Sequence, residues 1–123
     1  MDDSIILKDV KTSLGTFIDS AFDNQILSFV DQSILALTEL GCIKPLDSPI
    51  TKDTKWSDII VDAPKTNALY AIKQYIYLQV KLMFDPPVSG IIGIVKDRID
   101  ELYFRIDTAY NCTASSEVTN NGE

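Results

Sequence analysis

The sequence of 123 residues contains no histidine and only two cysteines, Cys42 and Cys112. Without an imidazole, neither a histidine-based catalytic triad nor a histidine-containing zinc site can form. The two cysteines lie far apart in the sequence and have no neighbouring activating groups, so we expect free thiols in a reducing cytoplasm. We therefore predict that the protein is not an enzyme and that it binds neither a metal nor a cofactor.

Positive charge and long apolar runs are also scarce. The chain carries 11 Lys and Arg against 18 Asp and Glu, a formal net charge of -7. Proteins that bind duplex DNA through its phosphates need a basic face, so this composition disfavours that function. No apolar run approaches the length of a membrane span, and the acidic residues 1–4 lack the positive charge of a secretory signal. We expect no contact with a membrane.

What the sequence does contain is apolar residues at helical spacing. The chain is long enough for one domain, and 46% of its residues are hydrophobic, enough for a core that needs no disulfide. Apolar residues recur every three or four positions over residues 4–14, 24–40, 64–84 and 89–108. We predict an all-α fold, a small bundle of about four helices within residues 1–108, with Asp3 or Ser4 capping the first helix.

The two remaining segments are polar and have no helical periodicity. Residues 42–63 form a long connecting segment between the second and third helices, rich in proline and other turn residues. Its single tryptophan, Trp56, is expected to pack a short helical turn onto the bundle. A loop of this length in a small domain is more often functional than idle. Residues 109–123 form a tail that we expect to be disordered in isolation.

The third predicted helix begins at Pro64 and is apolar on nearly all sides. Tyr70, Tyr77 and Phe84 form an aromatic line along it. A helix of this kind is either central in its own domain or packed against a neighbouring subunit. Asp85-Pro86-Pro87 then ends it sharply, because proline lacks a backbone donor and restricts the residue before it.

The fourth predicted helix begins at Ser89, which is expected to cap it. Its spacing directs one row of aliphatic residues toward the core: Ile92, Val95, Ile99, Leu102 and Ile106.

The helix that ends in Asp-Pro-Pro, together with the helix after it, resembles the head-tail connector proteins of tailed bacteriophages, also called head completion or adaptor proteins. Residues 75–84 read Y-I-Y-L-x-V-x-L-x-F and run into D-P-P, and residues 101–105 read E-L-x-x-R. A first helix ending near Leu14-Gly15, a second ending at Leu40-Gly41 and a tryptophan in the connecting segment agree in order. The resemblance covers roughly residues 5–107.

This resemblance implies a structural virion protein without enzymatic activity. Such a protein is made in the bacterial host cytoplasm and forms a homo-oligomeric ring, expected to be dodecameric, at the neck of the virion. The ring would lie between the portal protein and a neck, stopper or tail protein, and packaged DNA would pass through it without sequence-specific binding. The residues expected at subunit or partner interfaces are Trp56, Tyr70, Tyr77, Leu82, Phe84, Asp85, Pro86, Pro87 and Tyr110.

A cytoplasmic all-α interaction module or accessory subunit is the alternative. In that case the third helix would only fill the core, and the chain would be a monomer without a large exposed apolar patch. A ring protein must instead present apolar surface to its neighbours. A DNA-binding repressor fits less well, because a helix-turn-helix requires a short turn where this chain has a long segment.

Overall fold

The computed structural model describes residues 4–15, 18–61 and 66–111. Within these ranges the chain is helical and contains no β-strand, which confirms the predicted all-α class. The α-helices are α1 (Ile6–Ser13), α2 (Asp23–Leu37), α3 (Trp56–Ile59), α4 (Thr66–Phe84) and α5 (Ser89–Asn111), with the 3-10 turns η1 (Ser20–Phe22) and η2 (Thr38–Leu40) flanking α2.

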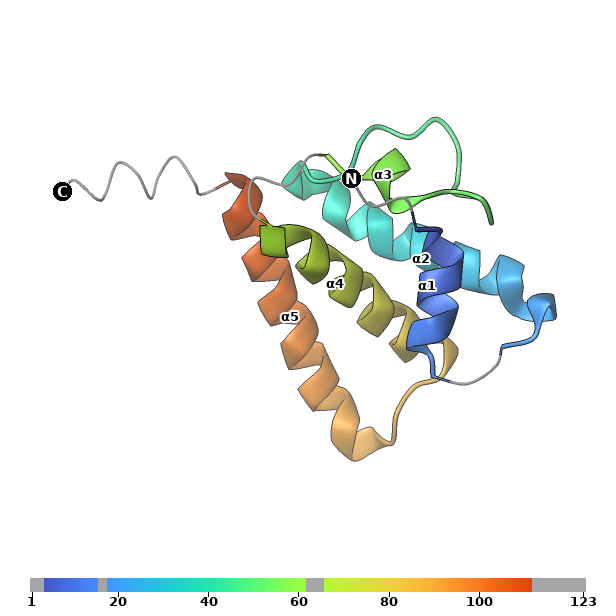
Figure 1. Ribbon diagram of the computed structural model, residues 1–123. Coiled ribbons are helices and arrows are strands. Elements are labelled where there is room, and N and C mark those ends of the chain that lie inside the picture. The colour runs from blue at the N-terminus through green and yellow to red at the C-terminus, as the bar shows by residue number, and fades with distance from the viewer. Residues whose placement is uncertain (1–3, 16–17, 62–65, 112–123) are drawn as a thin grey trace.

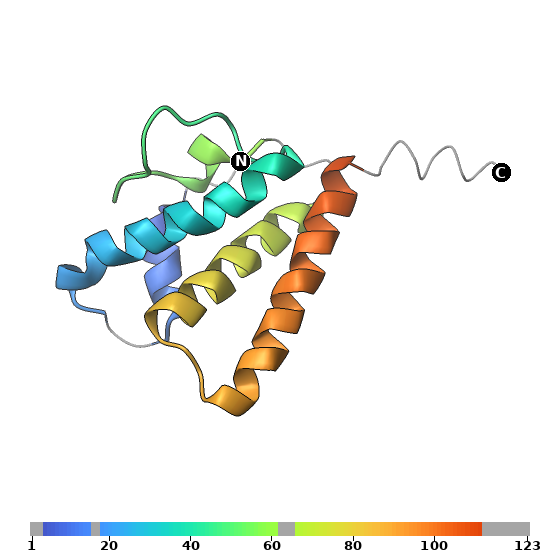
Figure 2. The same ribbon diagram turned by 180° about the vertical axis from the view of Figure 1, so that it is seen from behind.

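Three long helices form a fan in which α4 lies between α2 and α5 (Figures 1 and 2). The short helix α1 lies in front of α2 in Figure 1 and behind it in Figure 2. The C-terminal ends of α2 and α5 come together at one end of the fan, whereas α4 and α5 diverge toward the other. Because α2 and α5 are the two edges of the fan, each has an outer side that no other long helix covers.

The sequence left open whether the apolar helix α4 is central in its own domain or packed against a neighbouring subunit. In the structure it is central. It packs against α1, α2 and α5, so its apolar residues are needed inside the subunit. The side chains of Ile72, Ile76 and Val80 are fully buried, and those of Tyr77 and Phe84 pack against the edge of the core. The aromatic line is therefore mainly a core feature.

The helix ends follow the sequence signals only in part. Gly41 ends η2 with φ of 82°, a left-handed conformation that favours glycine. Helix α1 has Ile5 as its N-cap, without a side-chain hydrogen bond, so the prediction that Ser4 caps it is wrong. Ser4 instead accepts a hydrogen bond from the Trp56 backbone N–H, which places it beside α3. The predicted roles of Asp3 and Pro64 lie outside the described residues.

Helix α5 begins at Ser89, as predicted, but it extends further than predicted and its inward row is only partly buried. It continues through Asn111, beyond the predicted start of the tail, and Ala109 is buried. Residues 112–123 lie outside the described residues. The inward row is buried only from Ile99 onward, while Ile92 and Val95 are half-buried. Toward this end α5 diverges from α4, and Val95 packs only against the edge of the core.

Candidate assembly surfaces

Trp56 holds the long connecting segment to the bundle. Its side chain is 0% exposed, and its indole N–H donates a 2.8 Å hydrogen bond to the Asp9 carboxylate on α1. The ring meets Tyr77 of α4 edge-on at 6.2 Å between centroids, and the Lys73 ammonium lies 5.3 Å from the indole centroid. Trp56 therefore joins α1, α3 and α4, as its predicted anchoring role requires, and its buried side chain offers no surface to a partner.

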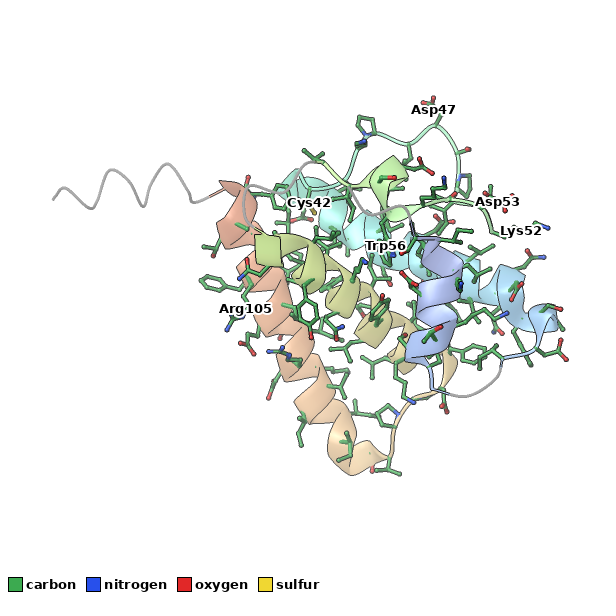
Figure 3. The ribbon with its side chains drawn as sticks, in the orientation of Figure 1. Cys42, Asp47, Lys52, Asp53, Trp56 and Arg105 are labelled. Atoms are coloured by element: carbon green, nitrogen blue, oxygen red, sulfur yellow. The ribbon has the colours of Figure 1, made fainter. Side chains whose placement is uncertain are left out.

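The loop before Trp56 is fixed at both sides of its tip. The Lys44 N–H donates to the Ile59 carbonyl at 2.7 Å, and the Lys44 ammonium donates to the Ser57 carbonyl at 3.0 Å. On the other side, the Ile50 N–H donates to the Asp31 carboxylate on α2 at 3.1 Å. We call residues 45–49 the loop tip. It is held in place by its two ends and projects away from the helices (Figure 3).

The loop tip carries an apolar and an acidic side chain beside the outer side of α2. Leu46 is exposed, and Leu35, which lies next to it across a groove of about 450 Å³, is 71% exposed. The Asp47 side chain is exposed and makes no hydrogen bond or ion pair with another described residue. The sequence did not indicate that these exposed leucines lie near an exposed carboxylate, because Leu35 is on α2 whereas Leu46 and Asp47 are on the loop.

At the opposite end, the turn between α4 and α5 carries a second apolar surface. Asp85 and Pro86 are exposed, and Asp85 pairs with Lys81 one helical turn earlier at 3.2 Å. After the turn the chain exposes three aliphatic side chains on adjoining turns, with Val88 at 74% and Ile94 at 64%. We call these residues the elbow ridge: Val88, Ile91 and Ile94.

A groove of about 590 Å³ adjoins the elbow ridge between α1, α4 and α5. Pro87 and Tyr77, both predicted interface residues, are part of its wall. Its lining is completed by Asp9, Thr12, Ser13, Gln74, Leu78, Lys81, Ile91 and Val95. Pro87 thus lies beside both the apolar elbow ridge and a largely apolar groove.

The predicted residues Leu82 and Phe84 contribute to the core. Leu82 is half-buried, and Phe84 packs edge-on against Phe22 with 5.6 Å between ring centroids. Tyr70 lies apart from them, on the exposed side of α4. Among the three residues of the aromatic line, only Tyr70 is mostly exposed.

Tyr110 and Asn111 fasten the end of α5 to the rest of the subunit. The Tyr110 hydroxyl donates to the Val61 carbonyl and the Asn111 amide donates to the Leu40 carbonyl, each at 2.9 Å. Tyr110 was predicted to contact a partner protein. Its hydroxyl group also has a structural role, because it attaches the C-terminal end of α5 to the chain at Val61.

The two arginines of the chain share one exposed carboxylate on α5, beside α4. Arg98 donates to one Glu101 oxygen at 2.8 Å, and Arg105 donates to the other at 2.9 Å and 3.1 Å. Hydrogen bonds from Arg105 and then Arg98 lower the pKa of the Glu101 carboxyl. The cluster carries a net positive charge, and most of its N–H donors stay free for a partner.

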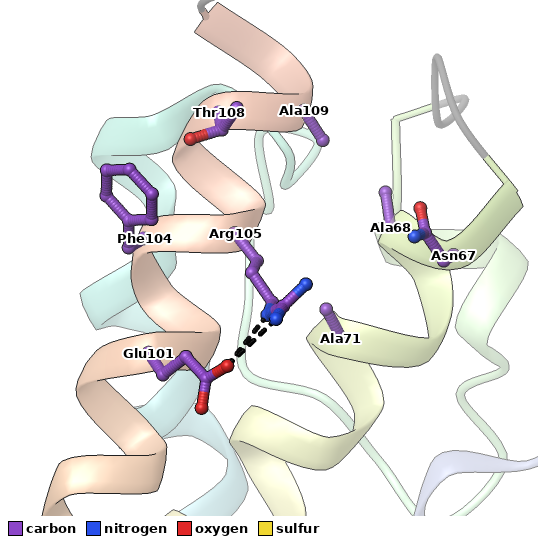
Figure 4. Close-up of a pocket in the computed structure, with 8 residues that line it drawn as sticks. All are labelled: Asn67, Ala68, Ala71, Glu101, Phe104, Arg105, Thr108 and Ala109. Carbon is purple, nitrogen blue, oxygen red and sulfur yellow. Dashed lines mark hydrogen bonds and ion pairs between the residues drawn. The ribbon is translucent and has the colours of Figure 1, made fainter.

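Arg105 also reaches over a groove of about 490 Å³ between α4 and α5, toward Ala71 (Figure 4). Its inner wall includes the buried Ala68, Ala71 and Ala109, and we call it the alanine groove. Phe104 lies at its rim and is 67% exposed. Exposed arginine and aromatic side chains are enriched at protein interfaces.

The described part of the chain shows neither a metal site nor a membrane-spanning helix. No group of His, Cys, Asp or Glu side chains there could hold a metal ion. Burial raises the pKa of the Cys42 thiol to about 11, so this cysteine is protonated and unreactive at neutral pH. None of the described helices combines the length and the apolar composition needed to cross a membrane.

The sequence matches a known family, described as Phage connector protein, over residues 6–113. The chain belongs to this phage connector family. No curated protein and no solved structure matches it. The match covers nearly the whole chain and confirms the resemblance seen in the helix–Asp-Pro-Pro–helix unit. The connector is therefore a structural phage protein that works together with other head or tail proteins, and its elbow ridge, loop tip and alanine groove are candidate surfaces for those contacts.

Proposed function

We propose that this connector forms a ring, expected to hold twelve copies, between the portal protein and the neck, stopper or tail protein of the virion. The ring extends the DNA channel and offers a docking surface to the next protein. A net charge of -7 suits a channel of this kind, because an acidic wall does not attract phosphates and DNA slides past it.

The observation that carries this proposal is the elbow ridge. Val88, Ile91 and Ile94 lie close together at the projecting end of α5, and they are exposed although the core is otherwise well formed. Monomeric proteins rarely keep aliphatic side chains grouped on a rigid projecting helix end, since burying them releases free energy. The elbow ridge is thus the surface we assign to contact with an adjoining protein of the head-tail joint.

If the protein were instead a monomeric helical interaction module, the apolar residues of its helices would only fill the core. Helix α4 meets that expectation, because α1, α2 and α5 surround it. The exposed ridge on α5 does not, and a family of structural phage proteins is the match. The ring proposal accounts for both observations.

A binding experiment with ridge variants tests the proposal. Ile91→Ser with Ile94→Ser removes most of the apolar ridge, while Lys96→Ser on the same helix serves as a control. Each chain is co-expressed with a tagged portal protein of the same phage and, separately, with the tagged neck protein. We expect the ridge variant to fold normally and to lose capture by one of the two partners, while the control is captured fully. Full capture of the ridge variant by both would contradict the assignment.

The proline turn gives a second test. Replacing Pro86 and Pro87 with alanine lets α4 run past its present end, because the missing backbone donor is restored. We expect unchanged total helicity by circular dichroism and a loss of assembled particles. Infectious particles in normal number from this double variant would count against a role for the elbow angle.

A further inference from the structure

The loop tip is a short exposed arch between two buried isoleucines. Ile43 and Ile50 are each 7% exposed, whereas the residues between them are all exposed. Ile43 forms an isolated antiparallel bridge with Ile60, and the Ile50 N–H donates to the Asp31 carboxylate on α2. Prolines stand at both ends of the tip, at positions 45 and 49, where each ring fixes φ and restricts the residue before it. The tip therefore has little conformational freedom left to lose when a partner binds.

The tip and the adjoining side of α2 present two leucines and one carboxylate to the outside. Leu46 is 41% exposed and Leu35 is 71% exposed. Asp47 is exposed and makes no hydrogen bond or ion pair with another described residue. Burying the leucines against a partner releases free energy, and an opposite charge beside them fixes the orientation of the contact. The complementary surface is an apolar pocket with a lysine or arginine at its rim.

The loop tip and the elbow ridge lie at opposite ends of the molecule. Asp47 is at the top in Figure 3, and the turn between α4 and α5 is at the bottom of the same view. Figures 1 and 2 are related by a rotation about the vertical axis, and the two segments keep these positions in both. The two surfaces share no residue. A protein that lies between two others needs two such surfaces, and one subunit can use both at once.

We propose that the loop tip and Leu35 bind the second neighbour of the connector, the head-tail protein that the elbow ridge does not contact. This inference rests on the proposed position of the connector between the portal protein and the neck, stopper or tail protein. Leu46 enters an apolar pocket of that neighbour, with Leu35 beside it, and Asp47 pairs with a basic side chain at the rim. The connector then holds one partner at each end of the subunit.

Separate variants of the two ends test this assignment. Leu46→Ser and Asp47→Lys alter the loop tip, and the Ile91→Ser, Ile94→Ser double variant alters the elbow ridge. Two controls are matched to the tip: Leu46→Met keeps an apolar side chain of similar volume, and Asp53→Lys reverses another exposed charge of the same connecting segment. Each purified chain is titrated against the immobilised portal protein and, separately, the immobilised neck protein of the same phage. Far-UV circular dichroism verifies that each variant is folded.

We expect each loop-tip variant to raise the half-saturating concentration for one partner roughly tenfold or more, while the ridge variant weakens binding of the other partner only. The two controls stay within about threefold of the native chain. Loop-tip variants that bind both proteins normally, or that lose the protein which the ridge variant also loses, would overturn the inference and leave the proposed function intact. A native chain that binds only one of the two proteins would also overturn it, and one that binds neither would overturn the proposed function as well.

Discussion

The hydrogen bond between Trp56 and Asp9 ties the long connecting segment to α1, and its removal has a calculable effect. The indole N–H lies 2.8 Å from the Asp9 carboxylate, and the rest of the indole is fully buried. Asp9→Ala leaves that N–H without a partner. Hydrogen bonds to charged groups contribute about 1.5–3 kcal/mol, and an acidic residue in the first turn of a helix adds roughly 0.3–1 kcal/mol. We expect a loss of about 2–3 kcal/mol in the free energy of unfolding.

A double-mutant cycle separates the hydrogen bond from the helix-terminus effect. Trp56→Phe removes the N–H donor, so in that background Asp9→Ala has only the smaller effect left, roughly 0.5 kcal/mol. The coupling energy between the two positions is then about 2 kcal/mol. Urea unfolding followed by circular dichroism suits all four chains, because Trp56 is the only tryptophan and its fluorescence vanishes in two of them.

The exposed Asp53 of the same loop supplies the control, and Asp53→Ala is expected to change the free energy of unfolding by less than about 0.5 kcal/mol. In a thermal scan, the loss from Asp9→Ala corresponds to roughly 8–12 °C, at about 4 °C per kcal/mol for a chain of this size. A coupling energy below about 0.5 kcal/mol would refute the anchoring of the loop by this bond.

Three further predictions concern other parts of the fold. Gly93 lies on the exposed face of α5, where an added Cβ meets nothing within 4 Å, so Gly93→Ala should raise the free energy of unfolding by about 0.5–1 kcal/mol in urea titrations. In a Cys112→Ser background, Cys42 should react with iodoacetamide at pH 8 at least a hundredfold more slowly in the native than in the unfolded chain. Because its folded pKa is raised to about 11 from 9.0, the stability that the buried thiol contributes is complete below pH 9 and declines as the pH rises through 11, visible as a falling urea midpoint. Deleting residues 112–123 should leave the thermal midpoint unchanged, whereas deleting residues 110–123 should lower it by several degrees, because the hydrogen bonds to the Val61 and Leu40 carbonyls are lost.

Helical periodicity predicted the framework because each buried row is local in the sequence. The residues of α2 that face the core, such as Val30, Ile34 and Leu37, recur at steps of three and four, and the structure buries them. The same rule overestimated the inward row of α5, where Ile92 and Val95 are only half-buried. Periodicity shows which side of a helix is apolar, but not whether another helix lies against it.

The candidate surfaces were only partly accessible from the sequence. The proline turn and Trp56 were found because both leave a local signal, a pair of prolines and a lone tryptophan in a polar segment. Arg105 and Asp47 leave no comparable signal. Their positions beside grooves depend on the folding of the loop onto α2 and on the packing of α5 against α4, which are features of the tertiary structure.

Electron microscopy of the connector bound to its portal tests the central claim most directly. The native chain is co-expressed with the portal protein of the same phage, with and without packaged DNA, and the purified complexes are imaged in negative stain. We expect a second ring stacked on the portal, with the axial channel continuous through both. Bare portals beside free connector monomers, in complexes taken before and after DNA packaging, would contradict it.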